Sequence, residues 1–145
     1  MKNVVFIISI LLLYSCKNEN NSHFSFPIQL LHGNSAKVWI LSKSNISTDP
    51  YFSSLENYRK TLTFHSNNTF RDQELIHLGS NRGQTGKYKI KKAEKDSNYE
   101  ILLNYSNEET LKLSIHSISN SKLVVKARLN PAAIWEFNTL KAPKI

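Results

Sequence analysis

Hydrophobic and polar side chains alternate along most of the chain after residue 35, with the period of two that is typical of a strand with one buried face. The alternation is clearest at residues 85–92, where Gly86, Tyr88 and Ile90 share one face and lysines occupy the other. Turn residues divide this pattern into eight segments. The predicted strands are residues 36–43, 59–65, 69–76, 85–92, 99–105, 110–117, 123–129 and 134–140.

The connections between these segments indicate how the strands pair. None is long enough to hold a crossover helix, so strands adjacent in sequence are expected to be antiparallel neighbours. Eight strands in such a meander predict an all-β fold, an antiparallel up-and-down barrel whose closure removes the exposed sheet edges. A two-sheet sandwich is the alternative. Pro27 and Gly33 predict a short N-terminal helical turn before the first strand.

A different pattern precedes the strands. Lys2 is followed by an apolar run at residues 4–13, which is shorter than the roughly 20 residues that a membrane-spanning helix needs. The run ends in Leu13-Tyr14-Ser15-Cys16, which resembles the lipobox of bacterial lipoproteins. That resemblance implies cleavage before Cys16 and attachment of lipid to this cysteine. We therefore expect a lipoprotein signal peptide at residues 1–15, a lipidated Cys16 with a flexible tether at 16–25, and a barrel domain at 26–145.

The net charge of the chain and the residue that follows Cys16 lead to expectations about its cellular compartment. The formal net charge is +8, and it falls to +7 without the first fifteen residues because Lys2 is their only charged side chain. A basic exported protein favours anionic lipid head groups as neighbours, and the chain lacks the basic helix typical of nucleic-acid binding. Lys17 follows the cysteine where Asp would resemble an inner-membrane retention signal. We expect lipid anchoring to the outer membrane, facing the periplasm or the cell surface, and no nucleic-acid partner.

Three short motifs give the barrel a family resemblance. They are Leu30-Leu31-His32-Gly33 running into Lys37-Val38-Trp39, then Leu62-Thr63-Phe64 with Asn68-Thr69-Phe70, and finally Thr85-Gly86-Lys87-Tyr88. Together they resemble the lipocalin-like lipoproteins of Bacteroidota over roughly residues 28–140. The resemblance implies a lipocalin-like barrel in an envelope lipoprotein.

Few residues of the sequence are candidates for catalysis, metal binding or cofactor binding. The five histidines show no metal-ligand spacing, Cys16 is the only cysteine, and no nucleophile elbow or phosphate-binding glycine loop occurs. Asp72 and Glu74 share one face of a predicted strand, as paired carboxylates would, but we interpret both as solvated side chains beside Arg71. We expect no metal, no cofactor and no enzymatic activity.

Large aromatic side chains are the remaining candidates for a binding role. Trp39, Phe64, Phe70, Tyr88 and Trp135 either line a ligand cavity in the barrel or fill its interior, and small barrels are often solid. Filling favours a membrane-anchored, non-catalytic interaction or accessory module whose loops meet an envelope protein. A cavity favours the alternative, which is carriage of a small apolar ligand.

Overall fold

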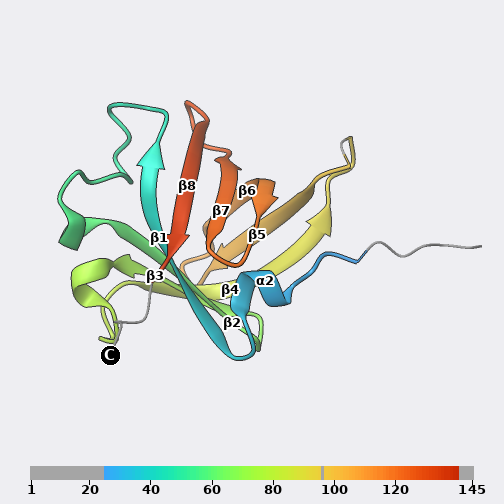
Figure 1. The fold of residues 1–145 in the computed structure, drawn as a ribbon, viewed down its shortest axis with the longest axis horizontal. Helices are drawn as coiled ribbons and strands as arrows, with labels where there is room; N and C mark the ends of the chain where they lie inside the picture. The colour runs from blue at the N-terminus through green and yellow to red at the C-terminus, as the bar shows by residue number, and fades with distance from the viewer. Residues whose placement is uncertain (1–24, 96, 141–145) are drawn as a thin grey trace, which may run out of the picture.

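The computed structural model describes residues 25–95 and 97–140, which form a closed antiparallel barrel (Figure 1). The signal segment, Cys16 and the tether up to residue 24 lie outside the described residues. The eight strands are β1 (Ala36–Ser44), β2 (Lys60–His65), β3 (Thr69–Glu74), β4 (Gln84–Lys92), β5 (Tyr99–Tyr105), β6 (Thr110–Ile118), β7 (Lys122–Ala127) and β8 (Ala133–Thr139). Each strand pairs with its neighbours in sequence, which confirms the predicted meander.

Pairing of the first strand with the last closes the barrel. Leu41 of β1 lies opposite Phe137 of β8, and Ser44 lies opposite Trp135, with a bulge between Leu41 and Lys43. A bulge bends a strand and increases its twist, which helps a sheet to curl onto itself. Figure 1 shows β1 and β8 side by side although they lie near opposite ends of the chain. The eight-stranded barrel is therefore confirmed over the sandwich alternative.

The structure departs from the predicted strands mainly at one boundary. The third strand ends at Glu74 instead of residue 76, and Leu75–His77 form a short 3-10 helix, η2. The apolar pair Leu75 and Ile76 extends the strand pattern in the sequence, but Ile76 is exposed. The backbone turns there because Leu78 N donates to Leu75 O at 3.0 Å.

A short helix, α2 (Gln29–His32), packs beside the start of β1 and ends at Gly33, whose positive φ suits that glycine. Leu31 is fully buried, and its carbonyl oxygen accepts a hydrogen bond of 2.8 Å from Trp39 Nε1. Lys37 lies over the Trp39 ring at 4.6 Å from the centroid, and its ammonium donates to Leu30 O. These contacts hold α2 to this end of the barrel.

The long loops lie at the other end, which we call the mouth. Because neighbouring strands are antiparallel, the connections at residues 45–59, 75–83, 106–109 and 128–132 all gather there. The end opposite the mouth holds α2 and the tight turn of residues 66–68. It also holds residue 25, because the Phe26 ring packs on Tyr99 at the start of β5, 5.2 Å between centroids. No helix within residues 25–95 and 97–140 is long and apolar enough to cross a membrane.

Large side chains fill the interior between these two ends. Leu62, Phe64, Phe137 and Trp135 are each 0% exposed, so no space for even a water molecule lies against them. Most side chains predicted to face inward are buried, while Ile90 and Leu111 are half-buried at the margin. Edge-to-face contacts order the aromatic rings, including Phe64 with Tyr88 and Trp135 with Phe137.

Candidate functional site at the barrel mouth

The five aromatic residues predicted to bind a ligand all lie in the filled interior. Trp39, Phe64, Phe70, Tyr88 and Trp135 are at most 2% exposed. Three of them also use their polar atoms within the protein: Trp39 as described above, Tyr88 by donating to His65 O at 2.9 Å, and Trp135 by donating to Asp49. Their part in ligand binding stays a prediction, and the observed packing does not favour it.

Polar groups enter the interior near the mouth. Lys60 begins β2 on the same face as Leu62 and Phe64, and Asp72 of β3 shares the inward face of Phe70. The Lys60 ammonium forms an ion pair with Asp72 Oδ2, and the Tyr105 hydroxyl donates to the same oxygen at 2.7 Å. Asp72 is therefore buried and paired, which corrects the interpretation of this residue as a solvated surface carboxylate. Glu74 lies at the rim and stays half exposed.

This cluster changes the acid–base properties of Tyr105. Burial, together with the negative charge of Asp72 and the hydrogen bond to it, raises the pKa of the Tyr105 hydroxyl far above its usual range. The phenol therefore stays protonated and continues to donate to Asp72. The Lys60 ammonium can donate three hydrogen bonds and Asp72 Oδ1 accepts none from the described residues, so the floor of the mouth can both donate and accept.

The carboxylate of Asp49 holds the long loop of residues 45–59 in place at the mouth. Asp49 is buried, and its Oδ2 accepts hydrogen bonds from Trp135 Nε1 at 2.6 Å and from Ser44 Oγ at 2.5 Å. Its Oδ1 accepts the backbone N–H of Tyr51 at 2.9 Å. Because Trp135 belongs to the core and Tyr51 to the loop, Asp49 fixes the Tyr51 ring beside the Lys60 ammonium, 5.2 Å from the ring centroid.

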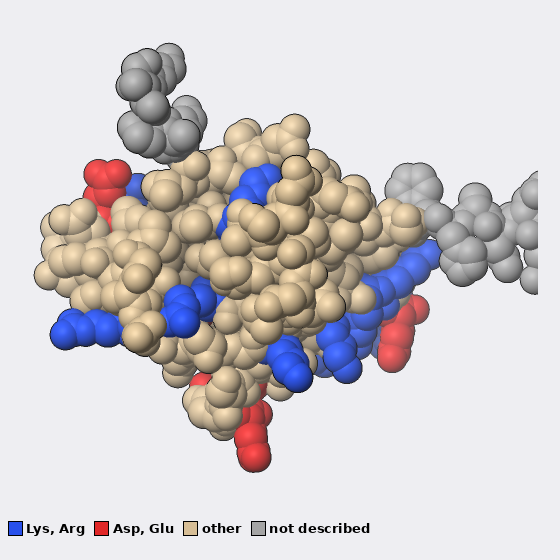
Figure 2. Space-filling model, turned by 90° about the horizontal axis from the view of Figure 1, so that it is seen from below, with Lys and Arg blue, Asp and Glu red and all other residues tan. Residues whose placement is uncertain are grey.

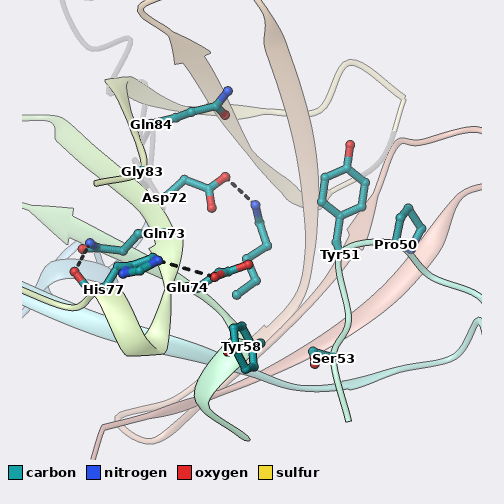
Figure 3. Close-up of a pocket in the computed structure, with 11 residues that line it drawn as sticks. Pro50, Tyr51, Ser53, Tyr58, Asp72, Gln73, Glu74, His77, Gly83 and Gln84 are labelled. Atoms are coloured by element: carbon teal, nitrogen blue, oxygen red, sulfur yellow. Dashed lines mark hydrogen bonds and ion pairs between the residues drawn. The ribbon is translucent and has the colours of Figure 1, made fainter. Parts of the chain in front are cut away.

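A pocket of about 490 Å³ opens between this loop and the β3–β4 connection. Figure 3 shows Pro50 and Tyr51 on one side of it, with Gln73, Glu74 and His77 on the opposite side. Lys60 and Asp72 also line this pocket. Gln73 Nε2 donates to the carbonyl oxygens of His77 and Arg82, which holds the β3–β4 connection in place.

Apolar side chains remain exposed around this pocket. Tyr51 is 43% exposed, Tyr58 50% and Leu55 64%, and all three come from the loop of residues 45–59. Ile76, also 50% exposed, comes from the β3–β4 connection, which touches this loop where Leu75 N donates to Arg59 O. Exposed apolar groups that gather at one place around a polar floor are typical of a binding surface.

Sequence reasoning did not find this site. Lys60 and Asp72 occupy inward-facing positions, so their opposite charges on neighbouring strands were the available signal of a buried pair. No such signal marks Asp49, because loop residues have no periodicity. Within the described part of the chain, no three His, Cys, Asp or Glu side chains are grouped as metal ligands would be.

The fold and the site together define a closed antiparallel barrel with a filled interior and a candidate binding surface at its mouth. Comparisons with protein-family models, curated proteins and solved structures found no match to this chain.

Proposed function

We propose that this protein is a lipid-anchored envelope lipoprotein whose non-catalytic, lipocalin-like barrel acts as an interaction or accessory module. Its partner is an envelope protein that binds the mouth. The observation that carries this proposal is the contrast between the two parts of the barrel: the interior is filled, while the mouth has a pocket and four exposed apolar side chains.

The position of the N-terminus supports this arrangement. Phe26 packs on Tyr99 at the end opposite the mouth. β4 runs from Gln84 at the mouth pocket to Lys92, which pairs with Tyr99. A strand of this length spans roughly 27 Å, so the described chain begins at the end of the barrel remote from the mouth. The mouth is then accessible to another protein of the envelope.

The character of the mouth also supports a protein partner. Protein interfaces are enriched in aromatic residues at their centre, where exposed Tyr51 and Tyr58 would contribute, and have a polar rim. Glu74 and His77 supply polar groups beside these rings. A partner side chain that enters the pocket would meet the Lys60 ammonium and the free oxygen of Asp72.

Site-specific photo-crosslinking in cells tests the proposal. A benzophenone amino acid replaces Tyr58 at the mouth or, as a matched control, Leu140 beyond the end of β8; these side chains are 50% and 49% exposed. We expect one discrete protein adduct from position 58 and none from position 140. The adduct should disappear when Leu55→Ser and Ile76→Ser are added, because they remove apolar area from the proposed interface.

Native mass spectrometry of the purified protein tests the alternative. Carriage of a small apolar ligand predicts a retained small mass that is released by denaturation. That result, together with no protein adduct at position 58, would replace the interaction module with a carrier.

A further inference from the structure

The outer surface of β4 to β6 is strongly basic, and its lysines do not line the mouth pocket. Lys87, Lys89 and Lys91 all point outward from β4, opposite to buried Tyr88. Lys112 of β6 continues the row, because Lys89 and Lys112 both lie opposite Leu102 of β5. Figure 2 shows Lys and Arg side chains gathered along one side of the molecule, with few Asp or Glu side chains among them. We call this surface, completed by Arg71, the basic face.

Little negative charge lies within the three strands of the basic face, although Glu94, Glu108 and Glu109 lie in the connections between them. Glu100 is the only acidic residue in β4, β5 and β6, and it already pairs with Lys91 and Arg128. Within the part of the chain that the structure describes, neither Lys87 nor Lys89 forms an ion pair. Uncompensated cations that repel one another are a cost to the folded protein, and an external anion would relieve it.

A groove of about 620 Å³ crosses the basic face. Arg71, Lys87 and Lys89 line it together with the hydroxyl groups of Thr69, Thr85 and Ser106, and no carboxylate does. Thr69 lies opposite Lys87 and Arg71 opposite Thr85, so the arginine and Lys87 are diagonal neighbours on adjacent strands. The hydroxyl groups of Thr69 and Ser106 already donate to Asn67 Oδ1 and Thr85 O, so the guanidinium and ammonium groups are the donors available to bind a phosphate.

The basic face also lies beside the place where the chain arrives from its N-terminal segment. Phe26 packs on Tyr99, which lies opposite Lys92 at the end of β4. Phe26 lies ten positions after Cys16, so a lipid on Cys16 holds this end of the barrel within about 35 Å of the bilayer. A connection of this length keeps the local concentration of lipid head groups at the basic face high.

We propose that the basic face docks on anionic phosphate head groups of the membrane, and that the groove of Arg71, Lys87 and Lys89 receives one of these phosphates. This inference rests on the lipid anchor in the proposed function, but it uses a surface separate from the mouth. Docking adds a second point of attachment and so orients the barrel on the membrane. Each basic residue at an anionic surface raises the ratio of docked to undocked protein by a factor of roughly five.

Lysine reactivity of the full-length protein tests the inference. The protein is incorporated into vesicles of phosphatidylcholine, with or without phosphatidylglycerol, and treated with a water-soluble acetylating reagent. Mass spectrometry then reports the modification of each lysine. We expect Lys87, Lys89 and Lys112 to be protected only in the anionic vesicles, and high salt to remove the protection. Lys43 and Lys122, which flank Glu136 on another face, should react equally in both vesicles.

A pair of charge-matched variants sharpens the test. K87Q with K89Q should lower the docked-to-undocked ratio about 25-fold, read as lost protection at Lys112, whereas K43Q with K122Q should leave protection unchanged. Equal reactivity of Lys87 and Lys89 in the two kinds of vesicle would overturn the inference. Protection by inorganic phosphate without vesicles would overturn it too, in favour of a soluble phosphate ligand. The intact mass of the same sample shows whether Cys16 carries lipid, so failure of the anchor and failure of the basic face are distinguished.

Discussion

Single side chains inside the barrel have two kinds of role, and Phe64 and Asp72 represent them. Phe64 fills space: it is 0% exposed and meets the Tyr88 ring edge to face at 5.0 Å. Asp72 satisfies charge, because it accepts from both Lys60 and Tyr105 at the floor of the mouth pocket, where it is only 8% exposed. Loss of the first side chain leaves a hole, whereas loss of the second leaves an unpaired charge.

The first prediction concerns Phe64. Phe64→Ala should lower the free energy of unfolding by about 3 to 5 kcal/mol, through lost burial and the cavity that remains. Denaturant unfolding followed by Trp fluorescence measures this loss. Tyr58→Ala, at an exposed aromatic side chain, should change stability little. A small loss for Phe64→Ala accompanied by weaker uptake of an apolar probe would contradict a filled interior.

The second prediction concerns the buried ion pair. Asp72→Asn leaves the Lys60 ammonium without its counter-charge, and such a loss costs about 3 to 5 kcal/mol. Lys60→Met with Asp72→Asn should recover part of this loss, because no buried charge remains unpaired. The exposed pair of Lys122 and Glu136 is the control, and Lys122→Gln should move the unfolding midpoint little. Equal effects of Asp72→Asn and Lys122→Gln would show that the Lys60 pair is solvated.

The third prediction is a pH dependence due to Tyr105. Burial and Asp72 raise the pKa of Tyr105 above the value of about 10 that it has when unfolded. Above pH 10 the unfolded chain therefore binds fewer protons than the folded chain. The stability from this group is complete below pH 10 and is lost progressively as pH rises toward the folded pKa. Tyr105→Phe should flatten the alkaline fall in melting temperature, and an unchanged slope would contradict this.

At the scale of elements, the shape of the mouth depends on the hydrogen bonds that hold the loop of residues 45–59 to the barrel. Residues 45–59 are long for a connection between antiparallel neighbours, and η1 (Glu56–Tyr58) is their only regular element. Asp49 joins this loop to the core through Trp135 and to β1 through Ser44. The position of Tyr51 at the pocket therefore depends on a carboxylate that does not itself line it.

The fourth prediction follows from this fastening. Asp49→Asn weakens the hydrogen bonds from Trp135 and Ser44, and the loop should open while the barrel stays folded. Hydrogen exchange should become faster at residues 45–59 and stay slow in β2 to β7. Glu56→Gln removes a carboxylate from the same loop without such contacts, and its exchange should match the original protein. Uniformly faster exchange across the strands would show instead that Asp49 supports the whole barrel.

The elements also show what the sequence can predict. Alternation placed all eight strands, because a barrel wall has one apolar and one polar face and Tyr88 or Leu113 must point inward. It failed at Leu75 and Ile76, which continue the apolar pattern of the strand in the sequence but belong to η2 in the structure. It also assigned Asp72 to the surface, because period-two patterns show which residues share a face but not which charges meet across neighbouring strands.

In the whole molecule, each end of the barrel has one of two proposed roles, which are recognition of a partner and attachment to the membrane. The mouth carries the proposed recognition surface, and the opposite end holds the first described residues of the chain. The basic face lies along the wall that joins the two ends. The proposed arrangement of the two roles assumes that the chain is attached to a membrane through lipid on Cys16.

The fifth prediction tests that attachment. Cys16→Ala should leave an unprocessed precursor that takes up no labelled palmitate, because the acceptor thiol is missing. Metabolic labelling and the intact mass of the protein measure both effects. Lys17→Ala is the matched control in the next residue and should be processed and labelled normally. Maturation and labelling of the Cys16→Ala protein would contradict a lipoprotein.

The pairing of β1 with β8 can form only late in folding, because the two strands are far apart in the sequence. Asn45 Oδ1 accepts the backbone N–H of Ile134 across 89 residues of chain, and all the pairing of β1 with β8 is equally remote. An edge strand without its partner exposes hydrogen-bonding groups that invite aggregation. The first strand must wait, unpaired on one side, until β8 has been synthesised. The barrel is therefore expected to fold slowly for its size.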